Sequence, residues 1–251
     1  MGPNLLILAG TTEATAMARA VSERGFTGTV SFAGRVERPL RQPLPQRIGG
    51  FGGVDGLARW LREAGTTHVI DATHPFAVQM SENAVNACAA AGVPLVALTR
   101  PEWKPRDGDL WTRVPDIAGA VAELQRRSTN VMLAVGRMHL LDFAPNPQHR
   151  YLLRLVDPPD GPLPFPDTTL VVDRGPFDEA ADRNLMLQHD IGLVVSKNSG
   201  GTGAYAKIAA ARSLGLPVVM IDRPAQPPRP EVYETKAVFD WIDHSGTDLG
   251  V

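Results

Sequence analysis

Glycine and hydroxyl residues with the spacing of an anion-binding turn occur near the start of the chain. Gly10, Thr11 and Thr12 directly follow a short apolar run and precede a helical pattern of apolar residues. Backbone N–H groups at the start of a helix, together with the helix dipole, favour a phosphate at such a turn. The two threonines supply hydroxyls as helix caps or as further phosphate donors. We predict a cofactor phosphate site here. A plain strand-to-helix turn is the alternative, because a single glycine falls short of G-x-G-x-x-G.

A second glycine-rich turn follows a buried apolar strand in the other half of the chain. It reads Lys197-Asn198-Ser199-Gly200-Gly201-Thr202-Gly203. A lysine, hydroxyls and glycines before a helix suit a carboxylate or a phosphate, with N–H groups as donors and the ammonium as a point charge. The lysine precedes the glycines, so the turn is not a Walker A loop. We predict ligand contacts from Lys197, Ser199, Gly201 and Thr202, and a flexible connecting turn is the alternative.

Two titratable side chains are candidates for proton transfer. Glu13 lies in the first turn of the predicted helix, where an acid ordinarily meets the helix dipole or caps the N-terminus; a catalytic role requires that it face the substrate. His74 ends the loop Asp71-Ala72-Thr73-His74, which follows a buried strand. This loop either holds the nicotinamide end of a cofactor, with His74 as proton donor, or merely forms a turn and caps a helix that begins at Pro75.

The end of the second predicted strand bears on the kind of dinucleotide. An acid about 20 residues beyond the glycine turn binds the ribose hydroxyls of NAD, whereas an arginine there accommodates the 2′-phosphate of NADP. Ser31, Gly34 and Arg35 stand in that region, and the acid is missing. We therefore predict NADPH and place these three residues in its binding site. The alternative is a solvated basic loop.

The elements that must position these residues alternate between strands and helices. Apolar runs that end in turn residues predict buried parallel strands, and apolar residues at i, i+3, i+4 and i+7 predict the helices between them. Residues 1–98 complete a first α/β domain, residues 99–110 are rich in proline and charge and predict a linker, and residues 111–251 form a second α/β domain. Loops at the carboxyl ends of the strands are the expected ligand sites. The segment 233–242 is compatible with a strand or with a closing helix.

The composition narrows the class of protein. The 251 residues are 43% hydrophobic, enough for one large or two small cores, and the net charge of −2 argues against nucleic acid as the main partner. Cys88 is the single cysteine, and no apolar run is long enough to span a membrane, so we expect a cytoplasmic protein. The histidines lack metal-ligand spacing and no G-x-S-x-G motif occurs, so neither a metal site nor a serine nucleophile is predicted. A two-electron reduction by NADPH fits what remains.

Four segments together resemble the precorrin-6A reductase family of cobalamin biosynthesis. They are Gly10-Thr11-Thr12-Glu13-Ala14, Asp71-Ala72-Thr73-His74-Pro75-Phe76-Ala77, Arg100-Pro101-Glu102-Trp103 and Lys197-Asn198-Ser199-Gly200-Gly201-Thr202-Gly203. The second and fourth are the more specific, and their order and spacing agree with the family. The first departs from it at Ala9, where the family usually has glycine, and at Thr15, where it usually has arginine. Any role of that arginine is here lost or taken over elsewhere.

The resemblance implies two Rossmann-like α/β domains, each a mainly parallel sheet flanked by helices, with the active site between them. It implies an NADPH-dependent reduction of one double bond of precorrin-6A to a dihydro macrocycle. This substrate is an anionic tetrapyrrole with many carboxylates, so the Gly10 and Gly201 turns are expected to open on a common crevice lined by basic residues. The candidates for substrate binding are Arg100, Lys104, Arg137, Lys197 and Lys207, with Trp103 beside them. The proton would come from water, Glu13 or His74.

Several alternatives stay open at this point. The substrate is either precorrin-6A itself or its cobalt-containing form, and a module that senses NADPH without catalysis is a further reading of the same turns. A short-chain reductase or epimerase would need a Tyr-x-x-x-Lys pair, which none of the three tyrosines provides. The resemblance also brings other enzymes of the corrin pathway into consideration as partners.

Overall fold

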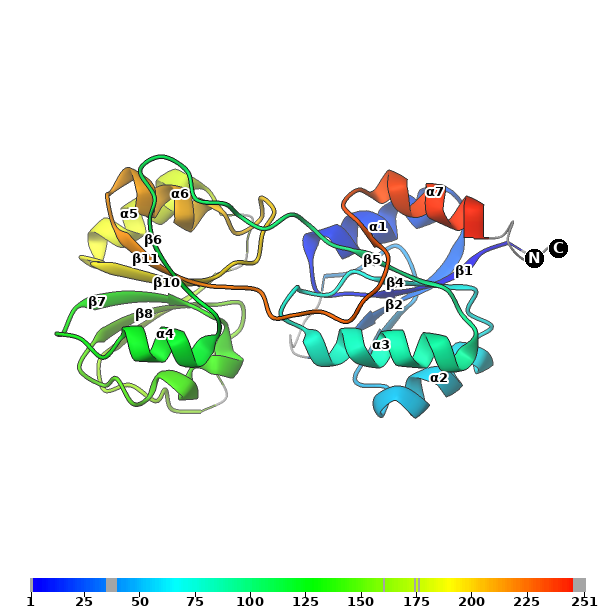
Figure 1. The fold of residues 1–251 in the computed structure, drawn as a ribbon, viewed down its shortest axis with the longest axis horizontal. Coiled ribbons are helices and arrows are strands. Elements are labelled where there is room, and N and C mark those ends of the chain that lie inside the picture. Colours follow the sequence, from blue (N-terminus) through cyan, green and yellow to red (C-terminus); the bar gives the residue numbers. More distant parts are fainter. Residues whose placement is uncertain (1, 35–39, 160, 174, 176, 246–251) are drawn as a thin grey trace. The chain divides into compact units, whose positions relative to one another are not determined.

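The computed structural model describes residues 2–34, 40–159, 161–173, 175 and 177–245, and the chain divides into two compact units. Unit 1 comprises Met1–Pro101 and Ala225–Val251, and unit 2 comprises Glu102–Pro224. Each unit contains one six-stranded sheet between helices (Figure 1), and these two sheets confirm the predicted α/β class with two Rossmann-like domains. Within the described ranges, no helix is both long and apolar enough to cross a membrane.

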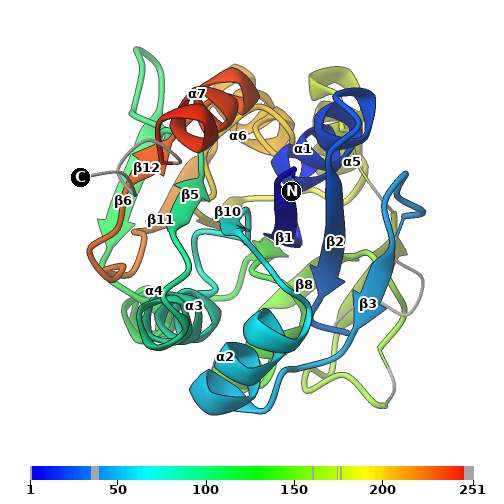
Figure 2. The same ribbon diagram turned by 90° about the vertical axis from the view of Figure 1, so that its right-hand side faces the viewer.

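The sheet of unit 1 has the strand order β12-β5-β4-β1-β2-β3, and every neighbouring pair is parallel. Its strands are β1 (Asn4–Leu8), β2 (Thr27–Phe32), β3 (Gln46–Ile48), β4 (His68–Asp71), β5 (Leu95–Leu98) and β12 (Glu231–Val232). Helices α1 (Thr12–Glu23) and α7 (Thr235–Ser245) cover one face, and α2 (Gly53–Glu63) and α3 (Val78–Ala91) cover the other (Figure 2). Because both faces are covered, the central strands are apolar on both sides instead of alternating.

The direction of strand addition reverses between β1 and β4, which makes this junction the topological switch point of unit 1. Leu8 of β1 pairs with Ser31 of β2 on one side and with Asp71 of β4 on the other. The segments that follow these three residues therefore leave the sheet at the same edge. Open α/β sheets bind ligands at this place, where helix N-termini and turn N–H groups gather.

The sheet of unit 2 is built in the same way, with the order β6-β11-β10-β7-β8-β9 and parallel neighbours. Its strands are β6 (Leu110–Val114), β7 (Asn130–Ala134), β8 (Arg150–Leu155), β9 (Thr168–Val172), β10 (Leu193–Lys197) and β11 (Pro217–Ile221). Helices α5 (Glu179–Gln188) and α6 (Ala206–Ser213) pack on one face; α4 (Ile117–Glu123) and the 3₁₀ helices η1 (Arg137–His139) and η2 (Leu141–Phe143) lie on the other (Figure 1). The switch point lies between β7 and β10.

The chain passes from unit 1 to unit 2 and then back to unit 1. β6, the first strand after β5, joins the sheet of unit 2, and β12, the strand after β11, joins the sheet of unit 1. Two connections, residues 99–109 and residues 222–230, therefore join the units. The first is the predicted linker, although β6 already begins at Leu110.

The C-terminal segment differs from the prediction, which assigns residues 111–251 to the second domain. Residues 225–251 belong to unit 1, and the tail contains both of the predicted alternatives, because the short strand β12 is followed by helix α7. Val238, Phe239 and Ile242 of α7 are buried in the unit 1 core. An amphipathic helix shows in its sequence which side chains it buries, but not which core receives them.

Candidate functional site

The Gly10 turn connects β1 to α1 at the switch point of unit 1. Gly10 has a φ of 153° and is exposed, and a Cβ atom built on it would have no described atom within 4 Å. Thr12 and Glu13 form the start of α1, where the leading N–H groups of a helix have no partners within the helix itself. Open space beside helix N-terminal donors fits a phosphate group.

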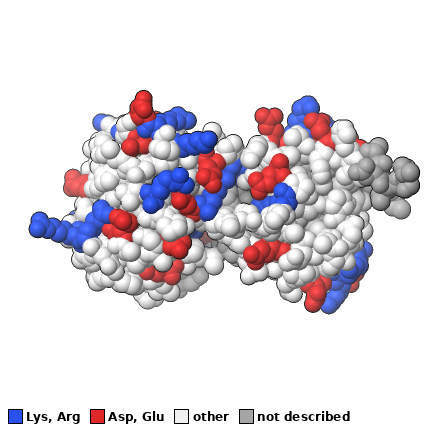
Figure 3. Space-filling view, viewed as in Figure 1, with Lys and Arg blue, Asp and Glu red and all other residues white. Residues whose placement is uncertain are grey.

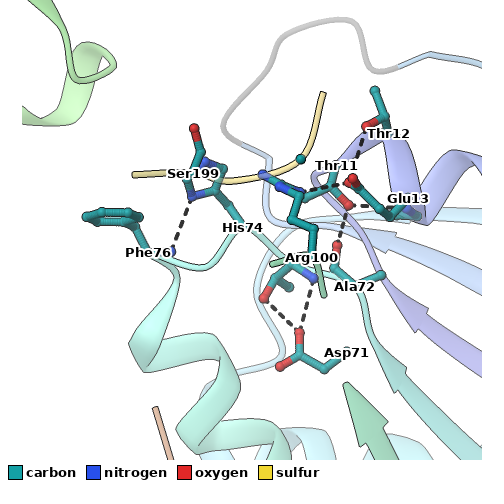
Figure 4. A network of polar contacts seen from close by, with 12 residues as sticks. Thr11, Thr12, Glu13, Asp71, Ala72, His74, Phe76, Arg100 and Ser199 are labelled. Carbon is teal, nitrogen blue, oxygen red and sulfur yellow. Dashed lines mark hydrogen bonds and ion pairs between the residues drawn. The ribbon is translucent and has the colours of Figure 1, made fainter. Parts of the chain in front are cut away.

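Thr11 ties together the two strands of the switch point. Its hydroxyl donates to the carbonyl oxygen of Ala72 at 2.8 Å and accepts from the N–H of Ala14 at 3.2 Å (Figure 4). Of the two roles predicted for the threonines, Thr11 therefore has that of a helix cap, and it also fixes the loop after β4 to the Gly10 turn. Thr12 is exposed, and its hydroxyl donates to Glu13 Oε2 at 3.2 Å.

The buried carboxylate of Asp71 accepts four hydrogen bonds. Oδ1 accepts from the N–H and the hydroxyl of Thr73, at 3.1 and 2.7 Å. Oδ2 accepts from the hydroxyl of Ser81 at 2.7 Å and from Nη1 of Arg229 at 2.8 Å. These bonds give the carboxylate the turn-forming role that the sequence allows for it. Asp71 thereby fixes the start of the loop 71–76.

His74 is held within this loop by its own neighbours. Its Nδ1 accepts from the N–H of Phe76 at 3.2 Å, and the two rings lie with their centroids 5.7 Å apart (Figure 4). A neutral imidazole that accepts at Nδ1 carries its proton on Nε2, the atom that could donate to a substrate. The prediction that a helix begins at Pro75 is wrong, because the N–H of Ala77 donates to His74 O at 2.7 Å and closes a turn before α3 starts at Val78.

Glu13 and Arg100 form an ion pair within unit 1. Nη1 of Arg100 lies 2.7 Å from Oε2 of Glu13, and the side chains are 13% and 23% exposed, respectively (Figure 4). The sequence predicts proton transfer for Glu13 and substrate binding for Arg100, and the structure brings the two together. A guanidinium held by a carboxylate is fixed in orientation, and its planar set of N–H groups matches a carboxylate. The contact favours a role for Glu13 in orienting Arg100.

The ribose end of the predicted cofactor site contains an arginine that the sequence prediction missed. Arg47 of β3 donates from Nη1 to Ser31 Oγ and to Gly49 O, both at 2.9 Å, and from Nη2 to Gly50 O at 3.1 Å. Its guanidinium lies 3.7 Å from the centre of the Phe51 ring. Partial burial lowers the pKa of Arg47. The hydrogen bonds of its guanidinium go to a hydroxyl and to carbonyl oxygens, so among the described residues its charge is not balanced by a carboxylate, which suits an anion.

Three other residues, Ser31, Gly34 and Arg35, are predicted for this end of the site. Ser31 is buried, and its hydroxyl is engaged by Arg47. Gly34 is exposed and has a φ of 78°, a conformation that favours glycine. Arg35 lies outside the described residues. The β2–β3 pairing puts Arg47 directly beside Ser31, and a sequence pattern alone does not show this pairing.

In unit 2 the glycine-rich turn occupies the position that the Asp71 loop has in unit 1. It follows β10, the strand across the switch point, just as the Asp71 loop follows β4. The counterpart of Gly10 is Gly136, which follows β7, is exposed and has a φ of 80°. Arg137 comes directly after it, at the start of η1. The switch point of unit 2 thus also gathers predicted binding residues at one edge of its sheet.

Trp103 and Asn198 hold the glycine-rich loop of unit 2 in place. The N–H of Trp103 donates to Asn198 Oδ1 at 2.9 Å, and Asn198 Nδ2 donates back to Trp103 O at 3.0 Å. The indole N–H donates to Gly201 O at 2.6 Å, and Trp103 is buried in the unit 2 core. Gly200 and Gly201 have φ values of 69° and 65°. Trp103 therefore supports the loop, whereas the sequence prediction has it contact the substrate.

The predicted basic and hydroxyl residues of this unit differ in accessibility. Lys197 and Arg137 are half-buried, Lys104 and Thr202 are exposed, and Ser199 is buried. Charges of both signs are interspersed on the face shown in Figure 3, as expected for a chain with a net charge of −2. A binding site for an anionic substrate must therefore be formed by a small group of basic residues and not by an overall positive charge.

Lys207 does not fit its predicted role in binding substrate carboxylates. The residue is 4% exposed, and its Nζ donates to Ala204 O at 2.7 Å and lies 5.1 Å from the centre of a Trp103 ring. Burial, helped by the charge of Arg154, lowers the pKa of Lys207 to about 7. Lys207 lies on the face of α6 that packs against the core of unit 2. Lys207 is therefore a structural residue of this unit.

Strand order and site geometry define the class of protein. Both sheets have the order of doubly wound dinucleotide-binding proteins, and unit 1 sets a glycine turn, a helix N-terminus and the β4 loop at its switch point. The family model described as "Precorrin-6x reductase CbiJ/CobK" matches residues 4–243. The chain belongs to this family of reductases, which confirms the resemblance seen in its motifs.

Individual relatives agree with this assignment along nearly the whole chain. The precorrin-6A reductase of Rhodobacter capsulatus is 55% identical over 98% of this chain and 99% of the relative. The cobalt-precorrin-6A reductase of Priestia megaterium is 30% identical over 88% of this chain and 90% of the relative. A solved structure described as "CobK precorrin-6A reductase" superposes with a TM-score of 0.95 at 54% identity and covers 97% of both chains.

Proposed function

We propose that this protein reduces one double bond of precorrin-6A with NADPH and releases a dihydro macrocycle and NADP⁺. The observation that carries the proposal is the Gly10 turn at the switch point, closed by the bond from Thr11 to Ala72, in a chain of the precorrin-6x reductase family. In the balanced reaction one carbon of the double bond gains a hydride and the other a proton. NADPH supplies the hydride. The protein must bind and orient NADPH and the macrocycle, and it must deliver the proton to the macrocycle.

The residues of unit 1 fit a dinucleotide. The Gly10 turn offers open space and the N–H groups at the start of α1 for the pyrophosphate. Arg47, whose charge has no described acidic partner, supports a 2′-phosphate at the ribose end, as does Arg35 from its place in the sequence. A nicotinamide cofactor follows from membership of a reductase family, and NADPH in preference to NADH is our proposal from these arginines.

His74 is our candidate for the proton donor. Its Nδ1 is engaged by the N–H of Phe76, so Nε2 carries the proton in the neutral ring. The loop that holds it is fixed through Asp71 and lies at the carboxyl end of β4, the edge at which we place the cofactor. Glu13 is the weaker candidate, because its carboxylate is already paired with Arg100.

The substrate carries many carboxylates, so it must meet arginines and lysines. In unit 1 we assign Arg100, oriented by Glu13, to one carboxylate. In unit 2 we assign Arg137, Lys197 and the N–H groups of the loop 199–202.

The relatives support a cobalt-free substrate. Two relatives named precorrin-6A reductase are 55% and 46% identical to this chain, whereas two named cobalt-precorrin-6A reductase are 30% and 29% identical. We therefore propose precorrin-6A itself, and not its cobalt complex, as the substrate.

The test is an anaerobic incubation of the purified protein with NADPH and precorrin-6A, followed by absorbance and by mass spectrometry of the macrocycle. We expect NADPH to be consumed when the macrocycle is present, and the product to gain two hydrogen atoms. A parallel reaction with the cobalt complex should be slower. Binding of NADPH with no consumption in either reaction would favour a sensing module over an enzyme.

A further inference from the structure

The second connection between the units, residues 222–230, carries two arginines whose partners lie in the ligand loops described above. Arg223 stands near its start and Arg229 near its end. The sequence shows a proline-rich segment here without helical or strand periodicity, so a solvated linker is the simplest expectation. Both arginines instead form hydrogen bonds to the loops after β4 and β10.

Within unit 1, this connection holds the loop 71–76 at two points. Nη1 of Arg229 donates to Asp71 Oδ2 at 2.8 Å, and the two side chains are 6% and 1% exposed. Gln226 Nε2 donates to Pro75 O at 2.6 Å. Asp71 is joined by one peptide bond to Ala72, whose carbonyl accepts the hydroxyl of Thr11. Arg229 is thus connected to the Gly10 turn through three links: its hydrogen bond to Asp71, the backbone from Asp71 to Ala72, and the hydrogen bond from Thr11 to Ala72.

Within unit 2, the same connection holds the start of the glycine-rich loop. Arg223 donates from Nε to Asn198 O and from Nη2 to Ser199 O, both at 3.0 Å. One planar guanidinium therefore fixes two consecutive carbonyl groups immediately before Gly200 and Gly201. Glycines have few steric restrictions on φ and ψ, so the conformation of such a loop depends on contacts outside it.

We propose that the connection 222–230 is a double brace. Arg229 is a positioning residue for the cofactor loop of unit 1, and Arg223 is a positioning residue for the substrate loop of unit 2. This inference rests on the proposed function, because that function assigns one ligand to each loop. The apparent affinity of a ligand is its intrinsic affinity multiplied by the fraction of time that its loop spends in the binding conformation. A loop that keeps its binding conformation for one tenth of the time would bind about tenfold more weakly.

The test compares Arg229→Gln and Arg223→Gln in the full-length protein. Arg113→Gln is the matched control, because Arg113 pairs with Asp222, next to Arg223, but its side chain is 57% exposed and touches neither loop. The dissociation constants of NADP⁺ and of precorrin-6A are measured in separate titrations by calorimetry. We expect Arg229→Gln to weaken NADP⁺ about tenfold and precorrin-6A less than about twofold, and Arg223→Gln to do the reverse. The control should change neither.

Arg229→Gln leaves the buried Asp71 carboxylate without its cation, which costs stability. Arg229→Lys keeps the charge, and thermal unfolding without ligand identifies any variant that does not fold. A loss of affinity shared equally by both ligands, or a lower Tm with unchanged affinities, would overturn the brace. If the unaltered protein binds no NADP⁺, the proposed function fails. If it binds both ligands and the two arginine variants behave like the Arg113 control, only the brace fails.

Discussion

Replacing Thr11 by valine tests whether the switch point is held as the structure indicates. The hydroxyl of Thr11 caps α1 through the N–H of Ala14 and donates to the carbonyl of the buried residue Ala72. Loss of an N-cap side chain costs about 1 kcal/mol. Loss of a bond to a buried carbonyl costs about 1–3 kcal/mol, because valine keeps the volume and leaves the oxygen without this donor. We expect a loss of about 2–4 kcal/mol in the free energy of unfolding.

The adjacent residue provides the control for this prediction. Thr12 is exposed, and within the described part of the chain its hydroxyl bonds to Glu13 Oε2 alone, at 3.2 Å, so Thr12→Val should stay within about 0.5 kcal/mol of the parent. Thermal unfolding followed by circular dichroism should show a Tm about 4–16 °C lower for Thr11→Val. Thr11→Ser keeps the hydroxyl and should recover most of the difference. Equal shifts for the Thr11 and Thr12 valine variants would refute the bridge.

Three further predictions concern charged groups. Glu13→Gln should raise the KM for precorrin-6A about tenfold and leave the dissociation constant of NADP⁺ unchanged, because Arg100 loses its orienting carboxylate; steady-state kinetics with a separate NADP⁺ titration decides this. Arg35→Ala should weaken NADPH far more than NADH, and equal losses would mean that this residue never touches the 2′-phosphate. Lys207 has a folded-state pKa of about 7, below its ordinary value of 10.5, so between these pH values the unfolded state binds the additional proton and stability rises with pH. Lys207→Met should flatten this rise in urea titrations across that range, and an unchanged slope would show that Lys207 is charged in the fold.

The sequence predicts the first strand, turn and helix of unit 1 because each depends on residues that are close together in the chain. An apolar run, a glycine and a helical period specify β1, the Gly10 turn and α1 within about twenty residues, and the cap by Thr11 is among the roles predicted for it. The loop after β4 is predicted from the same kind of local pattern, an apolar run that ends in turn residues. The roles of Glu13, His74 and the unit 2 loop in binding or catalysis stay predictions.

Contacts between distant segments account for the positions at which the structure differs from the sequence prediction. The sequence predicts Lys207 at a ligand, but the packing of α6 against the sheet buries it. The predicted site lacks Arg47 because β2–β3 pairing brings Ser31 to it, and lacks Arg229 because Asp71 lies 158 residues away in the chain. Sequence periodicity reports which face of an element is buried, and carries no information about which distant segment covers it.

The order of residues alone specifies the alternation of strands and helices, the two glycine turns and the family. Each of these follows from side chains within one turn or one element of the chain, or from motifs in a fixed order. Only the folded chain shows that β12 and α7 return to unit 1, and that arginines of a proline-rich connection hold the loops after β4 and β10. These features depend on hydrogen bonds and burial between segments far apart in the chain, and such contacts exist only once the sheets have assembled.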